Sequence, residues 1–419
     1  MRLSFLGAMA TVGASGVLVD TGTERLVLDY GTNVQERPPK FPLPVDGKPD
    51  AVLLSHCHLD HSGGVCLFTA GGNGCPIYAV DVTKPLTQLL LNDSIKISRE
   101  EGVQLPFTKS DVKRTIASFR AVEYRQPFRI GSCTVTAYDA GHIPGSMMTL
   151  VECEGKRMLY TSDFNSADTR LLKAADTELP EIDVLITEST YADRDHPDRR
   201  REERELVKLV NATLANDGIA LVSCFAVGRT QELLLVLDKH GIDYKLYVDG
   251  MAKKATTIIN RHAPRLRSPT ALDSALRKAT YITSGSQRKK AIKHPCVILT
   301  TSGMLSGGPI AWYLQQLYND RRSSLILTGF QVEGTPGRTL LETGRYITEE
   351  VNLGLRLLVR RFDFSAHVGR TLLFEFISRL QPQRIFCVHG DHTEEFAREL
   401  SEKGFDAVAP IANNRIFKV

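Results

Sequence analysis

The chain has few cysteines, and they are not arranged as a disulfide scaffold requires. Its eight cysteines lie scattered over 419 residues without a CxxC pair, which is typical of reduced thiols. No apolar run reaches the length of a transmembrane helix, and no secretory signal precedes the strand-like residues that follow Met1. Low-complexity tracts and internal repeats are also absent. These absences exclude a disulfide-rich secreted protein and a membrane partner, and they predict a globular, cytoplasmic protein.

Strong net charge is missing as well, but the charge is unevenly distributed. Lys and Arg number 52 against 48 Asp and Glu, and hydrophobic residues make up 42% of the chain. Between His196 and Asn352, however, 23 basic residues face 15 acidic ones. A basic segment of this size indicates a polyanionic partner such as nucleic acid. Basic runs are also common on solvated surfaces, so the charge alone does not decide the function.

What the chain does have is a dense group of metal-ligand side chains after a short apolar strand. The segment Val52–Gly64 presents His56, His58, Asp60 and His61 in quick succession. Imidazole and carboxylate ligands at this density suit a pair of divalent metals better than a single ion. His56 and His58 point to the same side in extended backbone, whereas Asp60 and His61 follow as the chain turns toward a helix. An ordinary polar loop rarely combines these features.

The same order of strand and then ligand recurs along the chain. Strand-like segments run into His142, Asp163 and His389, and an earlier one, Arg25–Tyr30, contains Asp29. With the HxHxDH pattern at residues 56–61, these matches resemble the metallo-β-lactamase superfamily. The resemblance implies two zinc ions per chain, with manganese as the alternative metal, and Asp163 shared between them. The implied ligands are His56, His58 and His142 for one metal and Asp60, His61 and His389 for the other. Asp29 is expected to hold the ligand loop by hydrogen bonds instead of binding metal.

Apolar strands alternate with amphipathic helices, which predicts an α/β fold. Under the resemblance this is the αββα metallo-β-lactamase sandwich, formed by residues 1–195 and 353–419. A polar run with a proline, Arg194–Arg204, marks the start of an insert over residues 196–352, which is expected to form a smaller α/β domain. In the insert we expect helices over 206–214 and 230–240 and strands over 219–224, 245–248, 296–301 and 324–328.

Motifs in and beside the insert resemble the β-CASP family. Ile186–Tyr191 carries Glu188 at the acidic position of motif A, Phe362–His367 matches motif B, and His389 serves as motif C. The similarity covers nearly the whole chain, and it points to the archaeal and bacterial relatives, without KH domains, of the endonuclease subunit of the cleavage and polyadenylation specificity factor.

This resemblance implies a zinc-dependent ribonuclease that hydrolyses RNA phosphodiester bonds through a hydroxide held by both metals, with Asp60 among the ligands. His367 would donate a proton to the leaving oxygen, and Glu188 would orient its ring and raise its pKa. His367 also favours RNA over DNA, because the DNA-repair branch usually carries Val in motif B. Endonucleolytic RNA processing is expected, with a 5′-3′ exoribonuclease as the alternative. A small-molecule hydrolase such as a thioesterase or lactonase would need neither the basic insert nor the Glu188–His367 pair.

RNA contacts are expected from the insert. Arg229 lies at a strand-to-helix turn, where backbone amides and a guanidinium can hold a phosphate. Ser302 and Gly303 lie on a similar turn, although a tight turn accounts for the glycine equally well. Lys253 or its neighbour Lys254 would add positive charge. RNA is therefore the expected partner, while a homodimer and an RNA-processing complex both stay open as assemblies.

Overall fold

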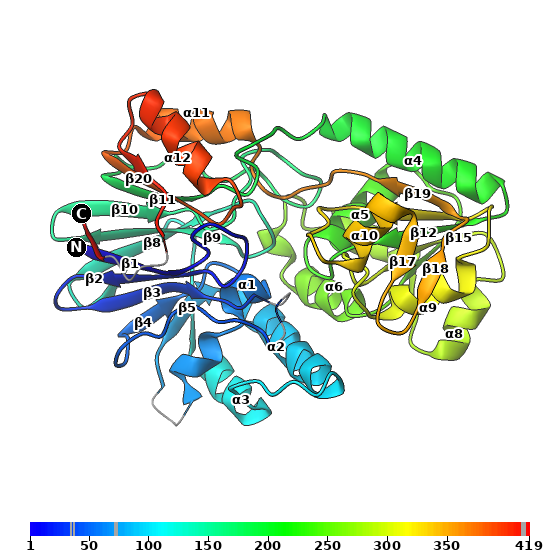
Figure 1. Ribbon diagram of the computed structural model, residues 1–419, viewed down its shortest axis with the longest axis horizontal. Helices are drawn as coiled ribbons and strands as arrows, with labels where there is room; N and C mark the ends of the chain where they lie inside the picture. Colours follow the sequence, from blue (N-terminus) through cyan, green and yellow to red (C-terminus); the bar gives the residue numbers. More distant parts are fainter. Residues whose placement is uncertain (34–35, 37, 71–73, 412–415) are drawn as a thin grey trace. The chain divides into compact units, whose positions relative to one another are not determined.

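The chain forms two compact units, each built from separate stretches of sequence (Figure 1). The computed structural model describes residues 1–33, 36, 38–70, 74–411 and 416–419. Unit 1 comprises Met1–Asp168, Ala174–Asp195 and Ala366–Val419, and unit 2 comprises Thr169–Lys173 and His196–Ser365. The insert was expected over residues 196–352, whereas unit 2 also includes Thr169–Lys173 and its larger stretch ends at Ser365. The reason for the later end is strand β19 (Leu358–Arg361), which pairs with β16 (Ser324–Leu327) in the sheet of unit 2.

Unit 1 contains two seven-stranded sheets. The first has the order β22-β1-β2-β3-β4-β5-β6 and the second the order β21-β20-β11-β10-β9-β8-β7. The strands of the first sheet are β1 (Arg2–Gly7), β2 (Gly16–Asp20), β3 (Arg25–Tyr30), β4 (Ala51–Leu53), β5 (Ile77–Val80), β6 (Phe119–Val122) and β22 (Ile416–Lys418). Those of the second are β7 (Phe128–Ile130), β8 (Cys133–Asp139), β9 (Met147–Cys153), β10 (Lys156–Tyr160), β11 (Val184–Glu188), β20 (Arg384–Val388) and β21 (Ala407–Val408).

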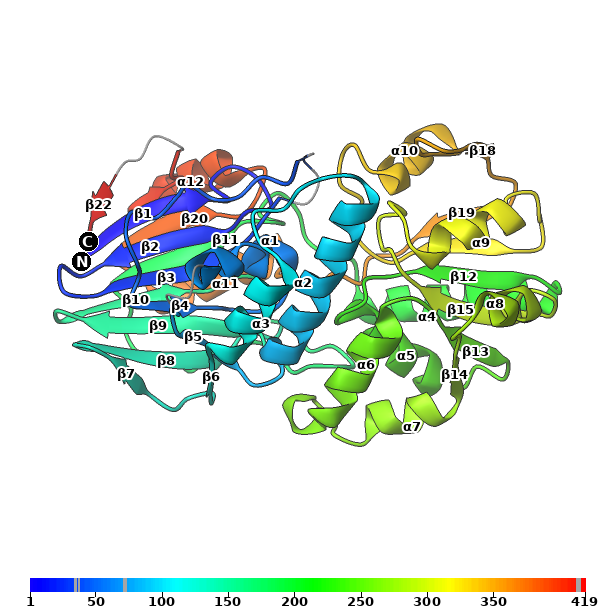
Figure 2. The same ribbon diagram turned by 90° about the horizontal axis from the view of Figure 1, so that it is seen from below.

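The two sheets pack face to face, and helices cover their outer faces. The helices are α1 (Leu59–Ser62), α2 (Thr83–Glu100) and α3 (Lys109–Ala117) on the first sheet, and α11 (Arg370–Leu380) and α12 (Thr393–Glu402) on the second (Figures 1 and 2). Strand β3 shows why this layering forms. Leu26 and Leu28 enter the core between the sheets, and Val27 enters the core under α2 and α3. The middle of β3 is apolar because it is buried on both faces, which matches the predicted αββα sandwich.

Unit 2 is a smaller α/β domain around a six-stranded sheet of order β14-β13-β15-β12-β16-β19, in which all pairs are parallel. Helix α4 (Arg199–Ala215) begins at Asp198, whose side chain accepts a hydrogen bond from the Arg201 backbone. Its Leu206, Val210 and Leu214 are buried, at the spacing that predicted a helix there. The remaining strands are β12 (Ile219–Ser223), β13 (Lys245–Val248), β14 (Ala279–Tyr281), β15 (Cys296–Thr300), and the separate pair β17 (Arg345–Ile347) and β18 (Asn352–Gly354). The remaining helices are α5 (Arg229–Lys239), α6 (Ala252–Arg261), α7 (Ala271–Arg277), α8 (Gly285–Ala291), α9 (Pro309–Leu317) and α10 (Pro336–Thr343).

The strand directions in unit 1 place the predicted ligands at one edge. Strands β10, β11 and β20 are parallel neighbours, so their carboxyl ends lie together. Asp163 follows β10, Glu188 is the last residue of β11, and His389 follows β20 directly. On the first sheet β3 and β4 are also parallel, and the segment with His56 follows β4. Side chains far apart in sequence therefore converge at this edge. Over the part of the chain that is described, no helix is long and apolar enough to cross a membrane.

Candidate active site

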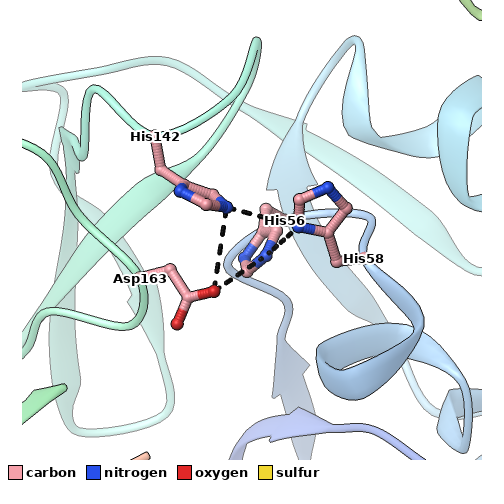
Figure 3. A group of neighbouring side chains, drawn as sticks. All are labelled: His56, His58, His142 and Asp163. Atoms are coloured by element: carbon pink, nitrogen blue, oxygen red, sulfur yellow. Dashed lines mark hydrogen bonds and ion pairs between the residues drawn. The ribbon is translucent and has the colours of Figure 1, made fainter. Parts of the chain in front are cut away.

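The structure brings His56, His58, His142 and Asp163 together in a first group of ligand atoms (Figure 3). His58 Nδ1 lies 3.2 Å from His56 Nε2 and 3.2 Å from His142 Nε2. Asp163 Oδ2 lies 3.6 Å from His56 Nε2 and 3.7 Å from His142 Nε2. His56 and His58 point into the same group, as expected for residues two apart in extended backbone.

A second group adjoins the first and consists of Asp60, His61, Asp163 and His389. Asp163 Oδ1 lies 3.3 Å from His61 Nε2, and Asp60 Oδ2 lies 3.5 Å from His389 Nε2 and 3.9 Å from His61 Nε2. Asp163 is thus the member common to both groups, with Oδ2 facing one and Oδ1 facing the other. All seven residues that the HxHxDH resemblance implied as ligands lie in these two groups.

The spacing of these atoms fits divalent cations. Two ligands at ordinary zinc–nitrogen and zinc–oxygen distances from one tetrahedral ion lie roughly 3.4 Å apart. The seven separations given above run from 3.2 to 3.9 Å, and all ligand atoms of a group lie within 4.8 Å of one another. Asp163 Oδ1 and His389 Nε2 are buried and have no hydrogen-bond partner among the described residues. Buried polar atoms rarely lack partners, so these two are available to a bound ion.

Hydrogen bonds on the far side of the imidazole rings leave lone pairs facing the groups. Ser55 Oγ donates to Asp29 at 2.7 Å and lies 2.9 Å from His56 Nδ1, so it accepts the proton of that nitrogen. His142 Nδ1 donates to the Ala366 carbonyl at 2.8 Å. In both rings Nε2 is then unprotonated and able to bind a cation, which is how metal-binding histidines are usually oriented.

Asp29 is fully buried, and its carboxylate accepts several hydrogen bonds that orient the site. Its carboxylate accepts from the Ser55 backbone at 2.7 Å, from His61 Nδ1 at 2.7 Å, from the Tyr160 hydroxyl at 2.9 Å and from Ser162 Oγ at 3.3 Å. Tyr160 ends β10 of the second sheet and Ser162 follows it, whereas Ser55 precedes His56 in the segment after β4. Asp29 therefore connects both sheets to that segment.

The electrostatics of the two groups differ. Burial and the neighbouring His61 imidazole hold the pKa of His56 well below its usual range. Burial alone would lower the pKa of His61 too, but Asp163 and Asp29 outweigh it and hold that pKa well above the usual range. Without a cation, a proton on His61 offsets the buried carboxylates around it. A divalent ion would take over this compensation.

Glu188 and His367 form a pair beside the two groups. Glu188 is 1% exposed, and its Oε2 accepts from His367 Nδ1 at 2.9 Å while its Oε1 accepts from the Phe164 backbone at 2.8 Å. Burial alone would lower the pKa of His367, but the carboxylates of Glu188 and Asp163 outweigh it and raise the pKa to about 9. His367 thus carries its proton at neutral pH, with Nε2 directed away from Glu188. Asp163, Glu188 and His367 also lie close enough to form a ligand group of their own.

The residues expected to contact RNA lie in unit 2, at the ends of its parallel strands. Arg229 begins α5 and donates to the Thr328 carbonyl after β16. Ser302 follows β15, its Oγ is buried, and Gly303 packs against the ring of Phe225. Lys253 has a structural use, because its ammonium donates to the Ile282 carbonyl.

Lys254, the neighbour of Lys253, is the more accessible of these two lysines. Lys254 is exposed on α6, whereas Lys253 has a half-buried side chain whose ammonium lies 3.7 Å from Asp249 Oδ1. A backbone carbonyl and a buried carboxylate already occupy Lys253. Lys254 is therefore the better candidate for a phosphate contact.

Several residues that position the site were not singled out from the sequence. Ser55, Tyr160, Ser162 and Thr190 all donate or accept hydrogen bonds at Asp29 or at the histidines. Serine, threonine and tyrosine are common everywhere, so their identity carries no signal. Their place one to three residues from an expected ligand, or in the case of Thr190 from Glu188, is the one feature that could have marked them.

A further group of metal-ligand atoms, Glu24, Cys133 and Cys153, lies elsewhere in unit 1. The Glu24 carboxylate is already occupied by the Ser132 backbone at 2.8 Å and Oγ at 2.6 Å, and by Thr21 Oγ1 at 3.0 Å. Burial raises the pKa of the Cys133 thiol to about 12, so it stays protonated at neutral pH. We interpret this group as structural, because its hydrogen bonds join the turn between β2 and β3 to the turn between β7 and β8.

Comparisons with known proteins show the family to which the chain belongs. Three family models match successive parts of the chain: the Metallo-beta-lactamase superfamily domain over residues 11–190, the Beta-Casp domain over 230–340, and the Zn-dependent metallo-hydrolase RNA specificity domain over 352–410. The Probable RNase MJ4 of Methanocaldococcus jannaschii is 34% identical over 99% of this chain and 100% of its own length. The chain belongs to the β-CASP family.

Other β-CASP relatives and a solved structure extend the comparison. The RNase aCSPSF2 of Saccharolobus solfataricus is 34% identical over 94% of this chain and 80% of its own length. The Transcription termination factor FttA of Methanocaldococcus jannaschii is also 34% identical, over 94% of this chain and 67% of its own. A crystal structure of a protein of unknown function from Enterococcus faecalis has a TM-score of 0.58 at 14% identity, covers 94% of this chain and 95% of its own, and shows that the fold is shared.

Proposed function

We propose that this β-CASP protein is a metal-dependent ribonuclease that cleaves RNA by hydrolysis. The observation that carries the proposal is the combination at one sheet edge of two ligand groups sharing Asp163 with a Glu188–His367 pair beside them. A small-molecule hydrolase of the same fold could use the ligand groups alone. The pair adds a proton donor, which a phosphodiester needs because its leaving oxygen departs as an alkoxide unless it is protonated.

In this proposal the first group, with His56, His58 and His142, and the second group, with Asp60, His61 and His389, hold one cation each. We propose zinc, with manganese as the alternative, because the ligands are imidazoles and carboxylates without a thiol. When bound, two such cations lower the pKa of water and offset negative charge on the phosphoryl oxygens. Asp163 would offer one oxygen to each cation. Asp29 keeps the proton of His61 on Nδ1 directly and that of His56 on Nδ1 through Ser55.

His367 then has the role of general acid. Its Nδ1 proton is bound to Glu188, so Nε2 is the nitrogen that can give a proton to a leaving oxygen. Glu188 keeps the imidazole charged and fixes its rotation, and the Phe164 backbone fixes Glu188 in turn. Because the raised pKa keeps a proton on this imidazole at neutral pH, we assign His367 to proton transfer and not to metal binding.

RNA is the proposed substrate class because two relatives at about one third identity are named RNases, and because one matching family model describes an RNA specificity domain. The basic composition of unit 2 agrees with a polyanion. We assign Arg229, Ser302, Gly303 and Lys254 as candidate contacts with RNA phosphates. The cutting mode that we propose is endonucleolytic, and a 5′-3′ exonuclease is the alternative; one relative 32% identical over 94% of this chain is named RNase J-like protein.

The test uses metal-replete protein with RNA labelled at either end and with circular RNA, and His58→Ala as the inactive control. An endonuclease cuts the circle and releases internal fragments with a 3′-hydroxyl and a 5′-phosphate, because hydrolysis by water needs no 2′-hydroxyl. Trimming from 5′ ends with no action on the circle would favour the exonuclease. Hydrolysis of thioesters without any action on RNA would refute the proposal.

A further inference from the structure

We propose that Thr190 is a positioning residue that sets the affinity of the second metal alone, by fixing the protonated nitrogen of His389. The inference rests on the proposed function, since it takes the second ligand group to hold a metal. Thr190 lies two residues after Glu188, so one short loop serves both the proton donor and a metal ligand.

The geometry fixes which atom donates. Thr190 Oγ1 donates to the His389 carbonyl at 3.1 Å and lies 3.2 Å from His389 Nδ1. A hydroxyl has one hydrogen, so an oxygen that donates to the carbonyl must accept from the ring. His389 therefore carries its proton on Nδ1, and its Nε2 holds a lone pair. That Nε2 is buried, has no hydrogen-bond partner in the described part of the chain, and lies 3.5 Å from Asp60 Oδ2.

A competing acceptor does not change this assignment. His389 Nδ1 also lies 3.2 Å from Asp163 Oδ1, but that oxygen has no hydrogen-bond partner among residues the structure describes. The contact is close without the direction of a hydrogen bond, whereas the contact with Thr190 has it. Thr190 is thus the group that decides the tautomer of His389.

The same hydroxyl also supports the backbone of His389. This residue has a φ of 53°, in the left-handed region that side chains other than glycine rarely adopt. Its backbone nitrogen donates to the Ala8 carbonyl at 2.7 Å, and its carbonyl accepts from Ser189 N at 3.2 Å as well as from Thr190. Thr190 therefore holds both the main chain and the ring of one ligand.

The effect should be confined to one metal. The other histidines of the two groups with an identified far-side partner use different oxygens: Ser55 for His56, Asp29 for His61 and the Ala366 carbonyl for His142. Among the residues that the structure describes, the hydroxyl of Thr190 forms hydrogen bonds with His389 only. Loss of its hydroxyl should leave the first group unchanged.

The decisive variant is Thr190→Val, which keeps the shape and removes the hydroxyl. Metal content after dialysis against a graded zinc chelator should show two ions in the natural protein. In the variant the first ion should be retained and the second bound about 10–100-fold more weakly, as is usual when such an outer hydrogen bond is lost. Thr190→Ser should restore the second ion. The matched control is Thr187→Val, because Thr187 is also buried and its hydroxyl donates to the Glu188 carbonyl and not to a histidine.

A spectroscopic measurement separates positioning from folding. In protein with ¹⁵N-labelled histidine, His389 should show its proton on Nδ1, and this signature should be lost in Thr190→Val while the melting temperature stays close to that of the control. Binding of the second ion within twofold of the natural protein, or equal weakening of both ions, would overturn the role of Thr190. If the natural protein itself binds fewer than two ions, the proposed two-metal function fails first, and this inference fails with it.

Discussion

Replacement of His367 by alanine gives the sharpest test of the proposed chemistry. The change removes the donor nitrogen but leaves every residue of the two ligand groups, so both metals should stay bound. Loss of a general acid costs on the order of 10²–10⁴ in rate, which is about 3–5 kcal/mol of transition-state stabilisation. His294→Ala is a suitable control, because His294 is an exposed histidine of unit 2.

The magnitude for Glu188→Gln follows from the pKa of His367. With that pKa raised to about 9, His367 is largely protonated at pH 8. An imidazole with the ordinary value would be only about 3% protonated at this pH. Removing the charge of Glu188 should therefore cost up to roughly 30-fold at pH 8 and less at pH 6. The amide has one accepting oxygen in place of two, so that oxygen must serve both the Phe164 backbone and His367 Nδ1. Some misorientation of the ring should therefore persist at low pH.

The assay compares cleavage of two RNAs that differ in one atom. In the second RNA the 3′-oxygen of a single linkage is replaced by sulfur, which leaves as a thiolate without a proton. The defects of His367→Ala and Glu188→Gln should shrink to within about tenfold on this substrate. Near-full activity of His367→Ala on ordinary RNA would refute the role of His367. Loss of a metal in His367→Ala would instead show that His367 is a metal ligand, in line with its place beside Asp163.

Three further outcomes are expected. Elemental analysis should give two divalent ions per chain, and His58→Ala should lose metal and activity together; one ion or none in folded, unchelated protein would contradict this. RNA cleavage should weaken steeply as salt rises, since phosphate contacts release counterions; a flat salt profile would speak against a basic binding face. Burial alone would raise the pKa of Asp249, but hydrogen bonds from Arg288 and the Gly250 backbone have the larger effect, so the pKa is lowered. This contribution to stability is complete above the unfolded value of about 3.9 and is lost as pH falls through the lower folded value. Asp249→Asn should thus destabilise unit 2 by about 2–4 kcal/mol at pH 7 and by less at pH 3, and an equal loss at both would show that charge is not the cause.

Much of the site could be predicted because metal binding needs specific residue types at the ends of specific strands. Strand β20 (Arg384–Val388) lies where the apolar run predicted it, and His389 follows at once. Buried strands are short and apolar, and only a few side chains bind divalent metals well. A strand followed by such a side chain is therefore a strong local signal, and parallel neighbours bring the ends together.

The parts that could not be predicted depend on contacts between distant residues. Thr190 and Ser55 position histidines through single hydrogen bonds, which leave no periodic pattern in the sequence. The sequence shows that Lys253 is basic. It does not show that the ammonium of Lys253 donates a hydrogen bond to the Ile282 carbonyl, because that bond joins α6 to the residue that follows β14. Unit 2 ends at Ser365 and not at the expected residue 352. The expected end was too early because β19 is a short and largely exposed edge strand, and its residues resemble those of an ordinary loop.

The short stretch Thr169–Lys173 limits how this protein can be taken apart. Glu232 of α5 is 5% exposed, and its carboxylate accepts from the backbone of Arg170 at 3.1 Å and of Leu171 at 2.8 Å. Excising residues 196–365 as one piece would leave this acid without its donors, at a cost of several kcal/mol. A chimera that exchanges the whole of unit 2 between relatives must therefore carry two non-contiguous pieces. The smaller piece begins six positions after Asp163. Gene-shuffling crossovers that separate the two pieces of unit 2 should therefore yield poorly folded chains.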